Sequence, residues 1–194
     1  MPDMPDTSSA RLYEFVDLLS KAAREMLQVK GNFDVSRKPV IVDKEVVSFH
    51  GRMRIDGLEK FNRRTVFSVV KFYTDAAHME RDRPVGALTV FVETEHLPKL
   101  LWSLEYPRID EDDDEAMLDG CGTLTNLIAG YYVKEIFDQG YVHLQMSHFE
   151  SYINTAVNGI AFSVDQTKKC EISFIIQGQK RIVVELTMSN VPRA

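Results

Sequence analysis

The segment EAMLDGCGTLTNLIAGYYVKEIF, residues 115–137, gives the clearest indication of how this chain folds. Its apolar residues recur in alternating steps of four and three, which is the spacing of one helical face. They are Met117, Cys121, Leu124, Ile128 and Tyr131, and the stripe is widened by Leu118, Leu127, Tyr132 and Ile136. The sequence therefore predicts a long helix with a broad buried side.

A second stripe of the same helix is polar or small. Its members lie three or four residues apart, so they share one side of the helix: Asp119, Thr123, Asn126 and Gly130. Gly120, Gly122 and Gly130 each cost roughly 1 kcal/mol relative to alanine in a helix interior. Close approach of another backbone is the usual compensation. Two interpretations stay open, a docking surface for a partner and tight packing against the protein's own sheet.

The composition indicates one globular domain. The chain has 194 residues, of which 44% are hydrophobic and 27% charged, and its net charge of −6 argues against a nucleic-acid partner. No apolar run approaches the roughly 20 residues that span a bilayer, so no membrane association is expected. The start, MPDMPDTSS, lacks the features of a signal peptide. Cys121 and Cys170 lie in apolar contexts, as expected for buried, reduced thiols in a cytoplasmic protein.

The charged segments offer weaker alternatives. The five histidines show no zinc-binding spacing, and no metal site is predicted. Residues 110–115 are all acidic, which favours a helix start at this point, with a divalent-cation site as the alternative. A basic cluster around a predicted turn indicates either a solvated hairpin or a patch for an acidic or phosphorylated partner: Arg52, Arg54, Lys60, Arg63 and Arg64.

The remaining segments predict an α+β (α/β layered) domain. Residues 1–9 form a disordered lead and residues 10–190 a single domain. A first helix ends near Gly31, and strands cover residues 40–55, 65–74 and 86–94. Residues 76–84 are expected to be a loop, and a short helix follows at EHLPKLLWSL. In SYINTAVNGIAFSV a short helix could precede a turn at Asn158–Gly159. A hairpin with its turn at Gly178–Gln179 closes the sheet.

The order of these segments resembles the CheX/CheC group of chemotaxis phosphatases. In that group a strand leads into a short helix, and the next long helix carries the motif G-E-ϕ-x-N-ϕ-ϕ-x-G, where ϕ is apolar. Here GTLTNLIAG, residues 122–130, fits at every position except one. The chain has one such helix, as CheX does, whereas CheC has two. The resemblance implies a mostly antiparallel sheet with a long central helix and flanking helices.

The resemblance also implies a reaction and a partner. Enzymes of the group hydrolyse the aspartyl phosphate of a CheY-like response regulator, across whose active site the motif helix lies. The implied catalytic residues are Asn126, which would hold the attacking water, and Thr123, which occupies the position of the glutamate that pairs with a regulator lysine. Partner docking would use Asp119, Gly122 and Gly130. The resemblance implies no cofactor for this chain, because the Mg²⁺ of the reaction belongs to the regulator. It also implies a homodimer that forms through strand edges.

The departure at Thr123 leaves three hypotheses. Thr123 has no charge to pair with a lysine. Asp119 lies about 10 Å from Asn126 along the helix axis, which is too far for it to replace the missing glutamate. Loss of one charge-assisted contact is worth about 1.5–3 kcal/mol. The chain is then a weakened or re-specified phosphatase, or a catalytically inactive CheX-like binding or scaffold module. The third hypothesis is a structural dimer whose polar stripe is internal packing.

Overall fold

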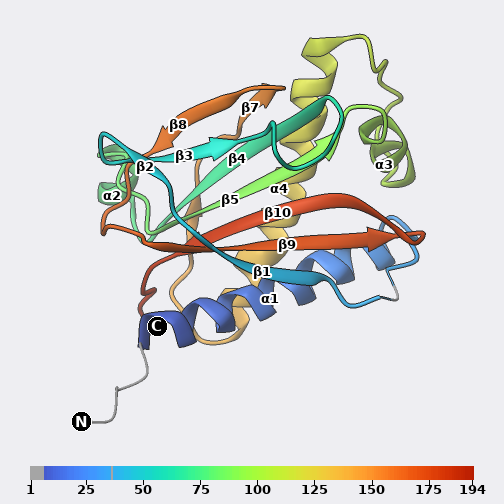
Figure 1. Cartoon of the computed structure of the whole chain (residues 1–194). Coiled ribbons are helices and arrows are strands. Elements are labelled where there is room, and N and C mark those ends of the chain that lie inside the picture. Colours follow the sequence, from blue (N-terminus) through green and yellow to red (C-terminus); the bar gives the residue numbers. More distant parts are fainter. Residues whose placement is uncertain (1–6, 36) are drawn as a thin grey trace.

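A large antiparallel sheet forms the centre of the molecule (Figure 1). The computed structural model describes residues 7–35 and 37–194. The order of strands in the sheet is β1–β9–β10–β5–β4–β6, and β7 also pairs with β4. These strands are β1 (Val40–Glu45), β4 (Thr65–Tyr73), β5 (Gly86–Glu93), β6 (Gln145–Met146), β7 (Glu150–Ile153), β9 (Lys168–Ile176) and β10 (Gln179–Met188).

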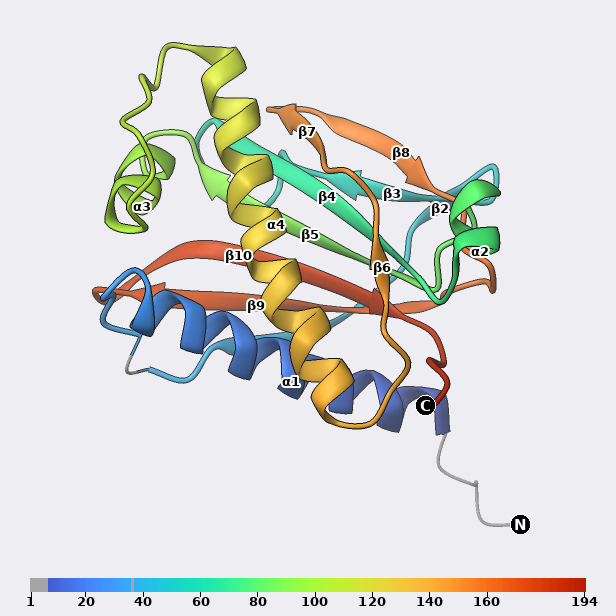
Figure 2. The same ribbon diagram turned by 180° about the vertical axis from the view of Figure 1, so that it is seen from behind.

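Two long helices, α1 (Thr7–Val29) and α4 (Asp114–Asp138), cover one face of this sheet (Figure 2). The main hydrophobic core lies between them and the strands. From β4 it takes Val66, Val70 and Phe72, whereas the alternate residues Phe67 and Val69 point to the other face. Burial on both faces explains why β4 and β5 are almost uninterrupted apolar runs.

A small second sheet covers part of the opposite face. Its order is β2 (Ser48–Phe49), β3 (Arg52–Asp56) and β8 (Ala156–Ile160). Met53 and Ile55 of β3 are buried against Phe67 and Phe91 of the large sheet, while the alternate Arg54 is exposed. The protein therefore has three layers, and two shorter helices, α2 (Ala76–Glu80) and α3 (Leu97–Ser103), lie at opposite ends of it.

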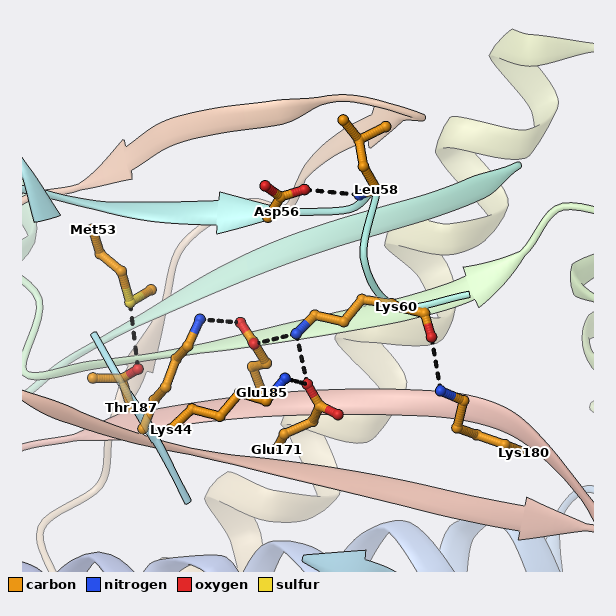
Figure 3. Close-up of polar contacts among 10 residues, drawn as sticks. Lys44, Met53, Asp56, Leu58, Lys60, Glu171, Lys180, Glu185 and Thr187 are labelled. Carbon is orange, nitrogen blue, oxygen red and sulfur yellow. Dashed lines mark hydrogen bonds and ion pairs between the residues drawn. The ribbon is translucent and has the colours of Figure 1, made fainter. Parts of the chain in front are cut away.

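A network of ion pairs lies on the outer face of β9 and β10 (Figure 3). Lys60, in the loop after β3, lies 2.5 Å from Glu185 and 2.6 Å from Glu171. Lys169 pairs with Glu185 at 2.8 Å, and Lys44 of β1 pairs with Glu171 at 2.7 Å. The pairing with Lys44 and Lys60 holds the pKa of Glu171 below its usual value, although burial opposes the shift. Lys60 and Glu185 are only 6% and 2% exposed, so each charge depends on its partners.

The helices and strands with strong periodicity confirm the predictions. The first helix, the strands at residues 65–74 and 86–94, the short helix and the C-terminal hairpin all appear near the expected positions. At the hairpin turn Gln177 and Gly178 both have positive φ, 51° and 79°, which matches the twist of the two strands. The mixed architecture with a mostly antiparallel sheet and a long central helix is also confirmed.

Three local predictions are wrong. Residues 76–84 begin with the short helix α2, which Asp75 caps by accepting a hydrogen bond from the His78 amide at 2.9 Å. The segment after residue 150 holds no helix: it forms β7 and β8, joined at Asn154, whose φ is 46°. Asn158 and Gly159 lie inside β8 and make no turn. Pairing with β4 and β3, which are distant in sequence, overrides the local propensity of this segment.

The predicted disordered lead, residues 1–9, falls mostly outside the part of the chain that the structure describes. Residues 1–6 lie outside the described residues, and α1 already begins at Thr7. No helix among the described residues combines the length and the apolarity needed to cross a bilayer.

The ion-pair network on the outer face predicts an asymmetric response to substitution. Lys60→Met leaves Glu171 with Lys44 and Glu185 with Lys169, so we expect a cost below about 1.5 kcal/mol. Glu185→Leu leaves Lys169 buried without its carboxylate, and we expect a loss of about 3–5 kcal/mol. Urea unfolding of both variants measures the difference, and equal costs would show that Lys169 does not depend on Glu185 for its burial.

Candidate functional site

Helix α4 begins at the acidic run, as the sequence indicates. Asp113 is its N-cap, and its Oδ1 accepts a hydrogen bond from the Ala116 amide at 3.1 Å. Asp114 and Glu115 lie in the first turn, where carboxylates interact favourably with the helix dipole. Arg64 pairs with Asp114 at 2.7 Å, which ties the loop before β4 to the helix start.

One side of α4 belongs to the core. Met117, Cys121, Leu124 and Ile128 are at most 1% exposed, as their spacing predicts, whereas Tyr131 is only partly buried. Burial raises the pKa of the Cys121 thiol to about 12, so this cysteine is an inert core residue. Cys170 is likewise a free, buried thiol.

The opposite side presents the polar stripe to solvent. Asp119 is exposed, and Thr123, Asn126 and Gly130 are partly exposed. The Asn126 amide and the Thr123 hydroxyl make no hydrogen bond to any residue that the structure describes. Thr125, by contrast, is buried and donates its hydroxyl hydrogen to the Cys121 carbonyl at 2.8 Å. Both donors and acceptors of the Asn126 amide are therefore available to a water or a partner.

The glycines of α4 have different surroundings. A Cβ added at Gly120 would lie 2.7 Å from Leu101 Cδ1 and 3.0 Å from Ile109 Cδ1, so this glycine allows α3 and the following loop to approach. A Cβ at Gly122 would overlap the ring of Phe149. At Gly130 no atom lies within 4 Å of an added Cβ. Gly122 thus serves internal packing, and only Gly130 leaves bare backbone at the surface.

The edge of the large sheet borders the stripe. Strand β7 packs against α4, and Phe149 precedes it, partly buried against Gly122. Glu150 is half exposed and lies 3.3 Å from Lys71 of β4. The sequence did not reveal Phe149 and β7 as neighbours of the stripe, because the weak alternation at residues 141–149 carries no signal of which helix it contacts.

The basic cluster does not form an open patch. Arg54 pairs with Asp56, Arg63 with Glu95 and Arg64 with Asp114. Arg52 donates to the Gly159 carbonyl at 2.9 Å, and Lys60 lies in the buried network. These contacts argue against the patch, but the expected hairpin is not formed either, because β3 pairs with β2 and β8 and β4 pairs with β5.

One cluster has ligand types that suit a metal, and it lies away from the acidic run. Within the described ranges, Glu93, Glu95 and His96 are the only such group. The Arg181 guanidinium contacts the Nε2 atom of His96, and Arg63 pairs with Glu95. Burial, followed by the charge of Arg181, lowers the pKa of His96. Cations already occupy the surroundings of these ligands, so the cluster is poorly suited to a metal ion.

Comparisons with known proteins give a consistent fold. No family model matches the chain, and no curated protein matches it in sequence. Among solved structures, a putative chemotaxis protein from Desulfovibrio vulgaris Hildenborough superposes with a TM-score of 0.60 at 15% identity, over 91% of this chain and 97% of the other. The chemotaxis protein CheX from Desulfovibrio desulfuricans gives a TM-score of 0.58 at 14% identity, over 91% and 99%.

The chain has the CheX/CheC fold. A third structure with this fold is the CheX–CheY–BeF3–Mg²⁺ complex from Borrelia burgdorferi, with a TM-score of 0.53 at 14% identity, over 91% of this chain and 98% of the matched chain. In the present chain, α4 is the helix that contains GTLTNLIAG, residues 122–130.

The glycines at positions 122 and 130 should respond differently to alanine. Gly130→Ala gains helix propensity without a clash, so we expect the free energy of unfolding to rise by roughly 1 kcal/mol. Gly122→Ala gains the same helix propensity but forces the Phe149 ring to move, which costs about 1–3 kcal/mol. We therefore expect the free energy of unfolding of this variant to stay level or fall. Thermal or urea unfolding of the pair measures this, and an equal rise in both variants would show that Phe149 does not restrain α4.

Proposed function

We propose that this chain acts on the aspartyl phosphate of a CheY-like response regulator, with α4 docked across the regulator's active site. The observation that carries the proposal is the Asn126 amide, partly exposed and without an internal hydrogen bond on the motif helix of a CheX/CheC fold. The CheX of similar fold from Borrelia burgdorferi is in complex with CheY, which supports a regulator as the partner.

The reaction needs positioning more than covalent chemistry. The oxygen of a water forms a bond to phosphorus while the bond between phosphorus and the aspartyl oxygen breaks, and one proton of the water is released. Asn126 can hold this water, because its amide both accepts and donates hydrogen bonds. Correct placement of a nucleophile lowers the barrier without any change in the protein's own bonds.

Thr123 lies one turn before Asn126 on the same surface, roughly 5 Å along the axis. Its hydroxyl can hydrogen-bond a partner but cannot neutralise a lysine. We propose that docking therefore depends more on Asp119, which offers a carboxylate at the exposed start of the stripe, and on Gly130, where open backbone allows close approach. The predicted docking role of Gly122 passes to Phe149, because the ring covers that glycine.

The threonine at position 123 also favours a second candidate function. A CheX-like module that lacks the charged contact can bind or scaffold a regulator without hydrolysing its phosphate. In both cases we propose a cytoplasmic protein that holds no metal of its own, since the Mg²⁺ of the reaction belongs to the regulator.

Two substitutions on α4 separate the enzyme from the binding module. Asn126→Ala removes the group that holds the water, so we expect dephosphorylation of the organism's own phosphorylated regulators to slow by about 100-fold or more. Thr123→Glu restores a charged contact of about 1.5–3 kcal/mol and should raise the rate by one to two orders of magnitude.

Asn158→Ala is the matched control, because Asn158 is an exposed amide on β8. Release of inorganic phosphate measures the rate of dephosphorylation by all three variants. A phosphatase rate that survives Asn126→Ala would refute the catalytic role. No rate in the wild type, together with binding of the phosphorylated regulator, would establish the scaffold function.

A homodimer through the edge strand β1 completes the proposal. β1 pairs with β9 on one side only, and it exposes apolar side chains on both faces: Val40 is 53%, Ile41 39% and Val42 45% exposed. An apolar edge strand is a template for pairing with another strand. A second copy of the chain, paired edge to edge, would cover these residues.

The dimer proposal is tested with a charge at the edge. Ile41→Lys should convert the dimer to a monomer, because a buried lysine without a partner is costly at such an interface. Leu58→Lys serves as control, since Leu58 is 53% exposed in the loop after β3. Light scattering after size exclusion gives the mass, and an unchanged mass for Ile41→Lys would exclude β1 as the interface.

A further inference from the structure

A hollow of about 530 Å³ lies between α3, the loop after it and the tip of the β9–β10 hairpin. Figure 2 shows α3 and this tip on the same side of the molecule. The apolar wall of the hollow includes Phe33, Leu100 and Ile176. Its volume lies within the range of about 300–1,000 Å³ that is typical of small-molecule sites.

The charged side chains that line the hollow are all basic. They are Lys99, Arg108 and Arg181, in a chain whose net charge is −6. None of the three forms an ion pair with a carboxylate of the described residues. Glu93 and Glu95 lie 2.9 and 3.2 Å from the His96 Nε2 atom that Arg181 contacts.

Other carboxylates lie beside the hollow. Glu95, Asp110 and Glu111 line a neighbouring, more open depression, which Lys99 and Arg108 border as well. Burial and the charge of Arg181 lower the pKa of His96, which favours the neutral form of this histidine. The hollow therefore presents three cations to a ligand, and the partly buried Arg181 is the one best placed to be desolvated with it.

Two flat groups stand at the rim. Trp102 is 54% exposed, and the Arg108 guanidinium carbon lies 4.5 Å from the centroid of its ring. A nucleobase stacks well on an indole ring or on a guanidinium plane. A phosphate, in turn, matches the fork of an arginine and the point charge of a lysine.

We propose that this hollow binds a mononucleotide-sized organic phosphate, with its ring against Trp102 and Arg108 and its phosphate at Lys99 and Arg181. The two parts of the ligand correspond to the two kinds of group that line the hollow. This site is independent of the proposed phosphatase function, because it uses none of the residues of the α4 stripe.

The only tryptophan of the chain reports on the hollow directly. Titration with AMP, GMP, CMP and UMP, followed both by fluorescence of Trp102 and by isothermal calorimetry, should give saturable binding for at least one nucleotide. The matching nucleoside and inorganic phosphate, each tested alone, should bind about tenfold more weakly or less, because each lacks one half of the contacts.

Arg181→Ala and Lys99→Gln should each weaken binding about tenfold or more, as expected for loss of a charge-assisted contact. Lys99 is exposed, so Lys99→Gln keeps the test valid if Arg181→Ala fails to fold. Arg83→Ala is the matched control: Arg83 is exposed just after α2, at the opposite end of the molecule from α3, and should leave binding unchanged (Figure 1). The absence of a calorimetric signal with all four nucleotides at millimolar concentration, or equal affinity in the Lys99 and Arg83 variants, would overturn the proposal.

Discussion

Close packing of α4 against its neighbours is the main physical requirement of this fold. Gly120 lets Leu101 and Ile109 approach the helix, and Gly122 lets the ring of Phe149 approach it. Each glycine costs roughly 1 kcal/mol of helix propensity. That cost is offset by dense packing, since α3 and the segment before β7 bury apolar groups against the helix. Held in this way, α4 keeps one narrow stripe free for solvent.

The two faces of the large sheet are covered by different physical means. The inner face is apolar and lies under α1 and α4. The outer face is apolar only beneath the small sheet, and over β9 and β10 it carries charges that neutralise one another. Burial of Lys60 between two glutamates anchors the loop after β3, and Arg63 and Arg64 connect the same loop to Glu95 and to the start of α4. Polar contacts therefore position the loop, while apolar contacts hold the layers together.

The proposed function rests on a few side chains that the core leaves exposed. The same helix supplies Cys121 and Leu124 to the core and Asn126 to the surface, so the core fixes the direction in which the amide points. The threonine at position 123 changes the chemistry of the stripe without changing the fold. A shared fold at 14–15% identity thus fixes the scaffold, and the activity has to be argued from the stripe itself.

Local periodicity and turn chemistry were enough to predict several features from the residues alone. They include the long helix and its two stripes, the buried strands β4 and β5, and the hairpin of β9 and β10. The partial exposure of Asn126 agrees with its place in the polar stripe, because helical spacing assigns each residue to a side.

The folded structure alone shows which segments meet. It placed β7 and β8 in two different sheets, Phe149 against Gly122, and Lys60 between Glu171 and Glu185. It also joined residues near positions 33, 100 and 180 around one hollow. These contacts link positions far apart in the chain, and their energy comes from burial and pairing that exist only once the layers have assembled. No local pattern of residues predicts such a contact, because each of the two residues, taken alone, has the sequence context of an ordinary surface or loop residue.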